Sequence, residues 1–76
     1  MAKRIRIDCY GMKSPEPVIK IAQAARTYPP ATVLAIQSDD MKLERDVREW
    51  AGTVKATILR IEKGESNLLI ELQLPG

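Results

Sequence analysis

The stretch that decides the fold is DCYGMKSPEP, which occupies residues 8–17. Its second half has the composition of a helix start. Serine at position 14 is a favoured N-cap, because its side-chain oxygen accepts a bond from an unpaired backbone N–H. Pro15 and Pro17 fit the first turn, where no intrahelical N–H is needed, and Glu16 puts negative charge at the positive end of the helix dipole. We therefore expect Ser14 to cap a helix.

The segment before this stretch has the pattern of a strand. Ile5 and Ile7 point one way and Arg4 and Arg6 the other, and this period of two indicates a half-buried strand over residues 3–8. We expect the basic side chains to form a solvated strand face.

The segment after this stretch continues the helix and then predicts a second strand. Apolar side chains recur at helical spacing, at Val18, Ile21, Ala22 and Ala25. Residues 28–30, Tyr-Pro-Pro, end the helix, because proline cannot continue it and restricts the residue before it. Residues 32–37 are a nearly continuous apolar run, which is typical of an interior strand.

A second helix is predicted over residues 41–51. Asp40 is expected to cap its start, and Gly52 is a good C′ residue for its end. The strand pattern returns at residues 54–62, with an irregularity after Ile58.

The chain closes with a predicted hairpin. Residues 63–67 have the composition of a turn, and residues 68–74 alternate between apolar and other side chains. The order β-α-β-α-β-β predicts an α/β (α+β) two-layer sandwich, a four-stranded mixed sheet with two helices on one face. We expect the helices to connect parallel neighbouring strands. A chain of 76 residues makes one domain, residues 1–76.

The composition excludes several functions. Cys9 is the only cysteine and there is no histidine, so an internal disulfide, a thiolate or imidazole zinc site and a histidine-dependent triad are all ruled out. We expect no metal, no cofactor and no independent enzyme activity. No apolar run is long enough to span a membrane, and a lone thiol suits the cytoplasm. The net charge of +2 is spread along the chain, so direct nucleic-acid binding is not expected.

Residues 8–17 resemble the signature D-x-x-G-x-x-C-P-x-P of TusA/SirA-like sulfur carriers. Asp8, Gly11, Pro15 and Pro17 match the fixed positions, and the cysteine of the CPxP motif is replaced by Ser14. Length and element order also resemble this family, so the resemblance covers nearly the whole chain.

The resemblance implies a role in sulfur transfer. Family members accept sulfur as a persulfide on the motif cysteine, from a cysteine desulfurase or another sulfurtransferase, and pass it to an acceptor protein, for example for tRNA thiolation. By this resemblance Asp8, Gly11, Pro15, Glu16 and Pro17 position the carrier residue.

A second matching region is the aspartate-containing turn before the second helix. Asp39, Asp40 and Arg45 are candidates for partner docking, although turn and cap roles are the simpler explanation of the two aspartates.

Serine at position 14 cannot carry a persulfide. It is either an engineered replacement or a natural loss of the carrier cysteine, and Cys9 is a possible alternative thiol or simply a small buried residue. Two alternatives to a carrier stay open: a thiol-less interaction or regulatory module of the same fold, and a small nucleic-acid-binding domain.

Overall fold

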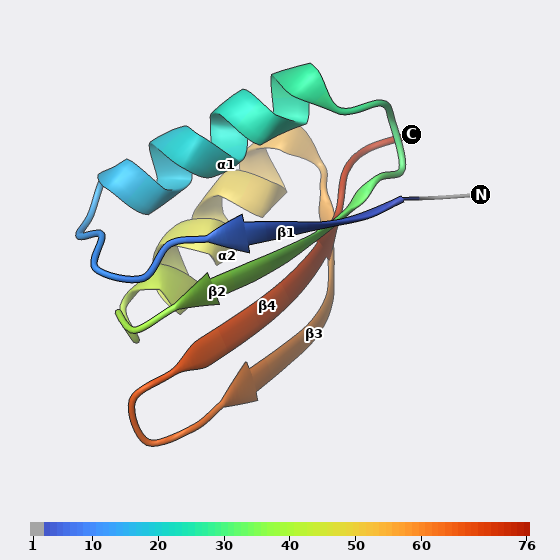
Figure 1. The fold of residues 1–76 in the computed structure, drawn as a ribbon. Coiled ribbons are helices and arrows are strands. Elements are labelled where there is room, and N and C mark those ends of the chain that lie inside the picture. The colour runs from blue at the N-terminus through green and yellow to red at the C-terminus, as the bar shows by residue number, and fades with distance from the viewer. Residues whose placement is uncertain (1–2) are drawn as a thin grey trace.

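The computed structural model describes residues 3–76 and shows a four-stranded sheet with two helices packed on one of its faces (Figure 1). The elements are β1 (Arg4–Asp8), α1 (Glu16–Thr27), β2 (Val33–Ser38), α2 (Leu43–Val54), β3 (Thr57–Lys63) and β4 (Leu68–Gln73). This order and layering confirm the predicted fold class. Residues 1 and 2, which the predicted domain includes, lie outside the described residues. Neither α1 nor α2, the two helices of residues 3–76, is long and apolar enough to cross a lipid bilayer.

The strands are ordered β1-β2-β4-β3. β1 pairs parallel with β2, whereas β4 pairs antiparallel with both β2 and β3. Parallel neighbours were therefore predicted correctly for the connection through α1 and wrongly for the connection through α2, because β4 lies between β2 and β3. The physical reason is burial: β4 presents Leu68, Ile70 and Leu72 to the core, where each is at most 2% exposed, so it occupies a central place.

The core lies between the sheet and the helices. Its fully buried side chains include Ile21 from α1, Val47 from α2, Leu34 and Ile36 from β2 and Ile70 from β4. Complete burial of such a side chain stabilises the fold by about 1.5–3 kcal/mol relative to exposure. The helices are thus held on one face by the apolar positions that the sequence pattern identified.

The start of α1 differs from the prediction by one position. The helix begins at Glu16 with Pro15 in the N-cap position, so Ser14 precedes the cap, and α1 has no side-chain capping bond. The Ser14–Pro15 peptide is cis. The predicted capping role of Ser14 is therefore wrong, and the residue is exposed.

Both ends of α2 also differ from the prediction. Asp40 shapes the turn before the helix rather than capping it, because α2 begins only at Leu43. Gly52 lies inside the helix, and Lys55, with φ 64°, forms the left-handed end. Ala51 is a core residue and Ala56 packs against the core, so the chain reverses only after α2 has covered the sheet.

The irregularity predicted in β3 is confirmed. The register with β4 shifts between Ile58 and Arg60, and Leu59 at the bulge is 52% exposed. Arg60 is thereby returned to the solvent face of the sheet, opposite Glu71. The predicted hairpin loop is closed by a 2.8 Å bond that the Gly64 N–H donates to the Asn67 carbonyl.

Candidate functional site

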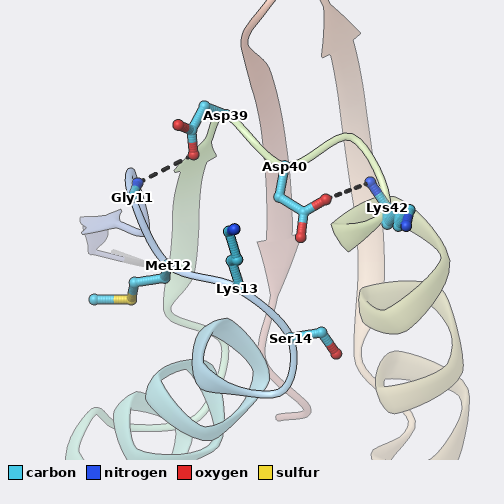
Figure 2. Close-up of a pocket in the computed structure, with 7 residues that line it drawn as sticks. All are labelled: Gly11, Met12, Lys13, Ser14, Asp39, Asp40 and Lys42. Carbon is cyan, nitrogen blue, oxygen red and sulfur yellow. Dashed lines mark hydrogen bonds between the residues drawn. The ribbon is translucent and has the colours of Figure 1, made fainter.

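The loop before α1 and the loop before α2 lie side by side at one end of the molecule (Figures 1 and 2). They follow β1 and β2, and the carboxyl ends of parallel neighbours meet at the same edge of a sheet. Between them is an open depression of about 470 Å³, lined by Gly11, Met12, Lys13, Ser14, Asp39, Asp40 and Lys42. Ser14 and the two predicted aspartates are therefore brought together by the fold.

The loop before α1 is shaped by backbone contacts at its start. Asp8 Oδ1 accepts a 3.0 Å bond from the Tyr10 N–H, and the Asp8 carbonyl accepts a 2.7 Å bond from Lys20 Nζ on α1. Gly11 then adopts φ +76°, a conformation that other residues reach only with strain. The fixed Asp8 and Gly11 of the motif thus turn the chain toward the depression.

The loop before α2 is held by its own side chains. The fully buried Ser38 accepts a 3.0 Å bond at its Oγ from the Asp40 N–H. Asp40 Oδ1 in turn accepts a 3.0 Å bond from the Lys42 N–H, and the Asp40 carbonyl accepts a bond from the Leu43 N–H. Asp39 therefore stands between two anchored residues, with its side chain directed to the other loop (Figure 2).

Ser14 is exposed at the edge of the depression, two residues before α1 begins. The first turn of a helix has backbone N–H groups without intrahelical partners, and its dipole stabilises a nearby anion. A thiolate at this position would lie beside this helix start, although Ser14 itself makes no capping bond to it. A serine hydroxyl gains no comparable reactivity, because the chain has no histidine to act as its base.

Cys9 is in a different environment from Ser14. Its side chain is fully buried in the core, and its N–H, just beyond the end of β1, donates a 2.7 Å bond to the carbonyl of Gln37 in β2. Burial raises the pKa of the Cys9 thiol, an effect opposed by the Lys20 ammonium and reinforced by the Asp8 carboxylate. Such a thiol is poorly reactive in the folded protein. The role of Cys9 as an alternative carrier stays a prediction.

The other predicted site residues occupy three places. Pro17 is buried, so it packs the first turn of α1 onto the core, whereas Pro15 and Glu16 are exposed beside Ser14. Arg45 lies on α2, where its Nε is 3.9 Å from Asp46 Oδ1. It is not among the residues that line the depression.

Three lysines near the site were not among the predicted site residues. Lys13 and Lys42 line the depression, where Figure 2 shows Lys13 beside the two aspartates, and Lys20 holds the Asp8 carbonyl. Lys13 and Lys42 could have been found as neighbours of motif residues in the sequence. Lys20 carries no such signal, since its contact depends on how α1 packs against β1.

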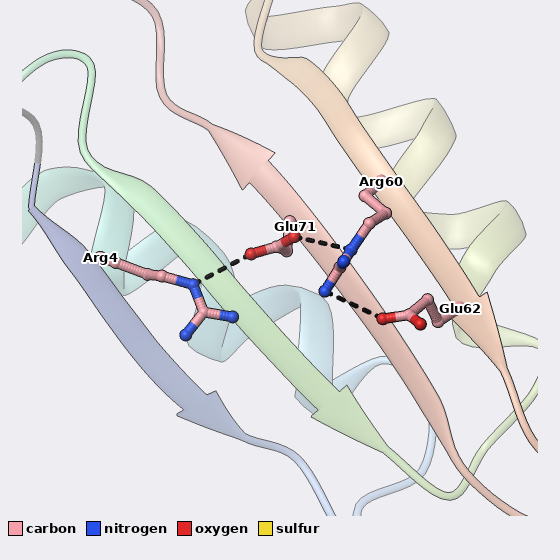
Figure 3. Close-up of polar contacts among 4 residues, drawn as sticks. All are labelled: Arg4, Arg60, Glu62 and Glu71. Carbon is pink, nitrogen blue, oxygen red and sulfur yellow. Dashed lines mark hydrogen bonds and ion pairs between the residues drawn. The ribbon is translucent and has the colours of Figure 1, made fainter.

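The open face of the sheet carries a further cluster of charged residues (Figure 3). Arg4 and Arg60 each approach Glu71 to 2.9 Å, and Arg60 also pairs with Glu62 at 2.9 Å. Arg4 and Arg60 are more than half exposed, so the pairs contribute about 0–1 kcal/mol each. The basic side chain of Arg4 therefore belongs to a solvated, partly neutralised strand face.

Fold and site together define a class of protein: a small two-layer α/β domain that presents one residue on a short loop immediately before a helix. The model of the family described as sulfurtransferase TusA matches residues 5–73, so the chain belongs to the TusA family. Membership supports a role in sulfur transfer with sulfur-transfer partners.

The fold has a close structural counterpart. A crystal structure of the SirA-like protein from Desulfitobacterium hafniense is similar with a TM-score of 0.81 and 20% sequence identity, over 95% of this chain and 99% of that chain. At this identity the likeness concerns the fold. A comparison with curated proteins found no match.

Proposed function

We propose that this protein acts in sulfur relay by docking to the partners of a TusA-like carrier, with residue 14 in the carrier position. The observation that supports this proposal is the exposure of Ser14 on the loop before α1, at the edge of the depression. With serine in that position the chain engages a sulfurtransferase or cysteine desulfurase but takes no sulfur there.

The chemistry explains why the replacement matters. In persulfide transfer a carrier thiolate attacks the outer sulfur of the donor persulfide. A new S–S bond forms on the carrier, and the donor leaves as a thiolate. The Ser14 hydroxyl has no accessible anion at neutral pH and cannot form this bond. The chain thus keeps the loop and helix start of a carrier but lacks the sulfur atom at position 14 that would react.

The central experiment restores the thiol. The Ser14→Cys variant is incubated with a cysteine desulfurase supplied with cysteine, and the intact mass is measured before and after reduction. We expect a reducible mass gain of one sulfur atom in the variant and none in the wild-type chain. A matched pair with Cys9→Ala in both backgrounds assigns the gain to position 14.

Other outcomes identify the alternatives. A gain in the wild-type chain that Cys9→Ala removes would assign the carrier role to Cys9. No gain in Ser14→Cys, while an authentic TusA carrier is loaded by the same donor, would contradict the carrier position of residue 14.

Docking is tested separately by competition. Excess wild-type chain should slow the loading of Ser14→Cys by the same donor, because both occupy one surface on the donor. Charge reversal at the candidate docking residues, Asp40→Lys and Arg45→Glu, should weaken the competition if they contact the partner. If wild type and both charge-reversed variants compete equally, Asp40 and Arg45 are not part of the docking surface.

A further inference from the structure

We propose that Asp39 is the positioning residue for position 14, acting through Gly11 rather than through contact with the sulfur donor. This inference rests on the proposed function in that position 14 is taken as the carrier position. The observation behind it is a 3.1 Å bond that the Gly11 N–H donates to Asp39 Oδ1, which joins two loops 28 residues apart in the sequence.

The bond acts on an exposed part of the loop. Gly11 has a left-handed conformation, and a Cβ built on it would face open space, with nothing within 4 Å. The turn around it is closed by a 3.2 Å bond that the Met12 N–H donates to the Cys9 carbonyl, and the Asp39 bond is what ties this turn to the other loop. Glycine also loses the most backbone freedom on folding. The Asp39 carboxylate offsets this loss by anchoring the Gly11 N–H three residues before Ser14.

The other end of the bond is anchored. Asp39 lies between Ser38, which is fully buried, and Asp40, which is held by the Ser38 hydroxyl and by the turn into α2. The loop before α2 thus provides a rigid arm, and the Asp39 side chain extends from it to the loop that carries Ser14 (Figure 2).

Asp40 offers a matched control beside it. Both aspartates line the same depression and carry the same charge. The side-chain bond of Asp40 is local, because its Oδ1 accepts the Lys42 N–H, whereas the bond of Asp39 crosses to the other loop. Replacing each in turn therefore separates the loss of a charge at the depression from the loss of the bond between the loops.

The first test uses the protein with its own Ser14. Amide exchange of Gly11 is measured by NMR in the wild type, Asp39→Ala, Asp39→Asn and Asp40→Ala, with urea midpoints to confirm that each is folded. We expect Asp39→Ala to speed Gly11 exchange about fivefold or more, since one hydrogen bond is lost. Asp39→Asn keeps an acceptor oxygen and should stay near wild type. Asp40→Ala loses only the bond within the loop before α2 and keeps the one from its N–H to Ser38, so it should speed Gly11 exchange less than Asp39→Ala does.

The second test measures the thiol pKa in the Ser14→Cys background from the pH profile of alkylation, with Cys9→Ala included throughout. If Asp39 acted only by its charge, Asp39→Ala and Asp39→Asn would lower that pKa equally, because each removes a nearby negative charge. Positioning predicts instead that the pKa in Asp39→Ala lies above that in Asp39→Asn by about half a unit, roughly threefold less thiolate at pH 7.

The outcomes separate the two proposals. Equal Gly11 exchange in Asp39→Ala and wild type, or equal pKa values in the two Asp39 variants, would overturn the positioning role. Failure of Ser14→Cys to take up sulfur would instead contradict the proposed function, since neither Gly11 exchange nor the alkylation profile needs a sulfur donor.

Discussion

Positions 9 and 14 belong to one loop, five positions apart, and the fold treats them in opposite ways. The chain's only thiol, at Cys9, is sealed in the core with a raised pKa, whereas the hydroxyl of Ser14 is exposed beside the first turn of α1. Reactivity in this loop is therefore decided by where a side chain is placed as much as by what it is. The only thiol of this chain is therefore in a position poorly suited to relay.

The largest expected difference between the two positions is in thiol reactivity. In the folded wild type Cys9 should react with iodoacetamide only through opening of the core, on the order of a thousandfold more slowly than the thiol introduced by Ser14→Cys. The measurement is the rate of mass gain at pH 8 without denaturant. Fast, complete modification of the folded wild type would show that Cys9 is accessible and would support its role as an alternative carrier.

The next largest difference is in stability. Cys9→Ala removes a buried sulfur from the core and should lower the free energy of unfolding by about 1–2 kcal/mol, measured by urea titration. Ile36→Ala, in the same core, is a positive control that should cost about 2–5 kcal/mol. An unchanged midpoint for Cys9→Ala would mean that the thiol contributes nothing to packing.

Alkaline pH should distinguish the two positions more weakly. The folded-state pKa of Cys9 is raised above its ordinary value of 9.0, so the folded state keeps the proton where the unfolded state loses it. The stability that this contributes is complete below pH 9 and is lost as pH rises toward the folded-state pKa. The wild type should therefore lose more stability than Cys9→Ala between pH 8 and pH 10, and parallel curves would contradict the raised pKa.

The smallest expected effect belongs to Ser14→Ala. Because α1 has no side-chain capping bond, this change should alter the free energy of unfolding by less than about 0.5 kcal/mol. Replacing a serine that does cap a helix by alanine would instead lower the free energy of unfolding by about 1 kcal/mol. Urea titration against Thr27→Ala, an exposed residue at the other end of α1, provides the comparison.

Much of the fold was predictable because the signals are local. Period-two and helical patterns located all six elements, and the two prolines after Ser14 placed the helix start within one residue of its position. The irregularity after Ile58 was visible as a break in alternation. The ends of α2 were less accurate, because they depend on how far the helix must run to cover the sheet.

What the sequence by itself determined is the order of the elements, their apolar faces and the place of residue 14 next to the start of α1, since these follow from periodicity and proline chemistry over a few residues. Only the tertiary structure decided that β4 lies between β2 and β3, that Cys9 is buried, and that Asp39 reaches Gly11. Each of these depends on which apolar faces are buried together and on contacts between distant segments, and no local pattern encodes them.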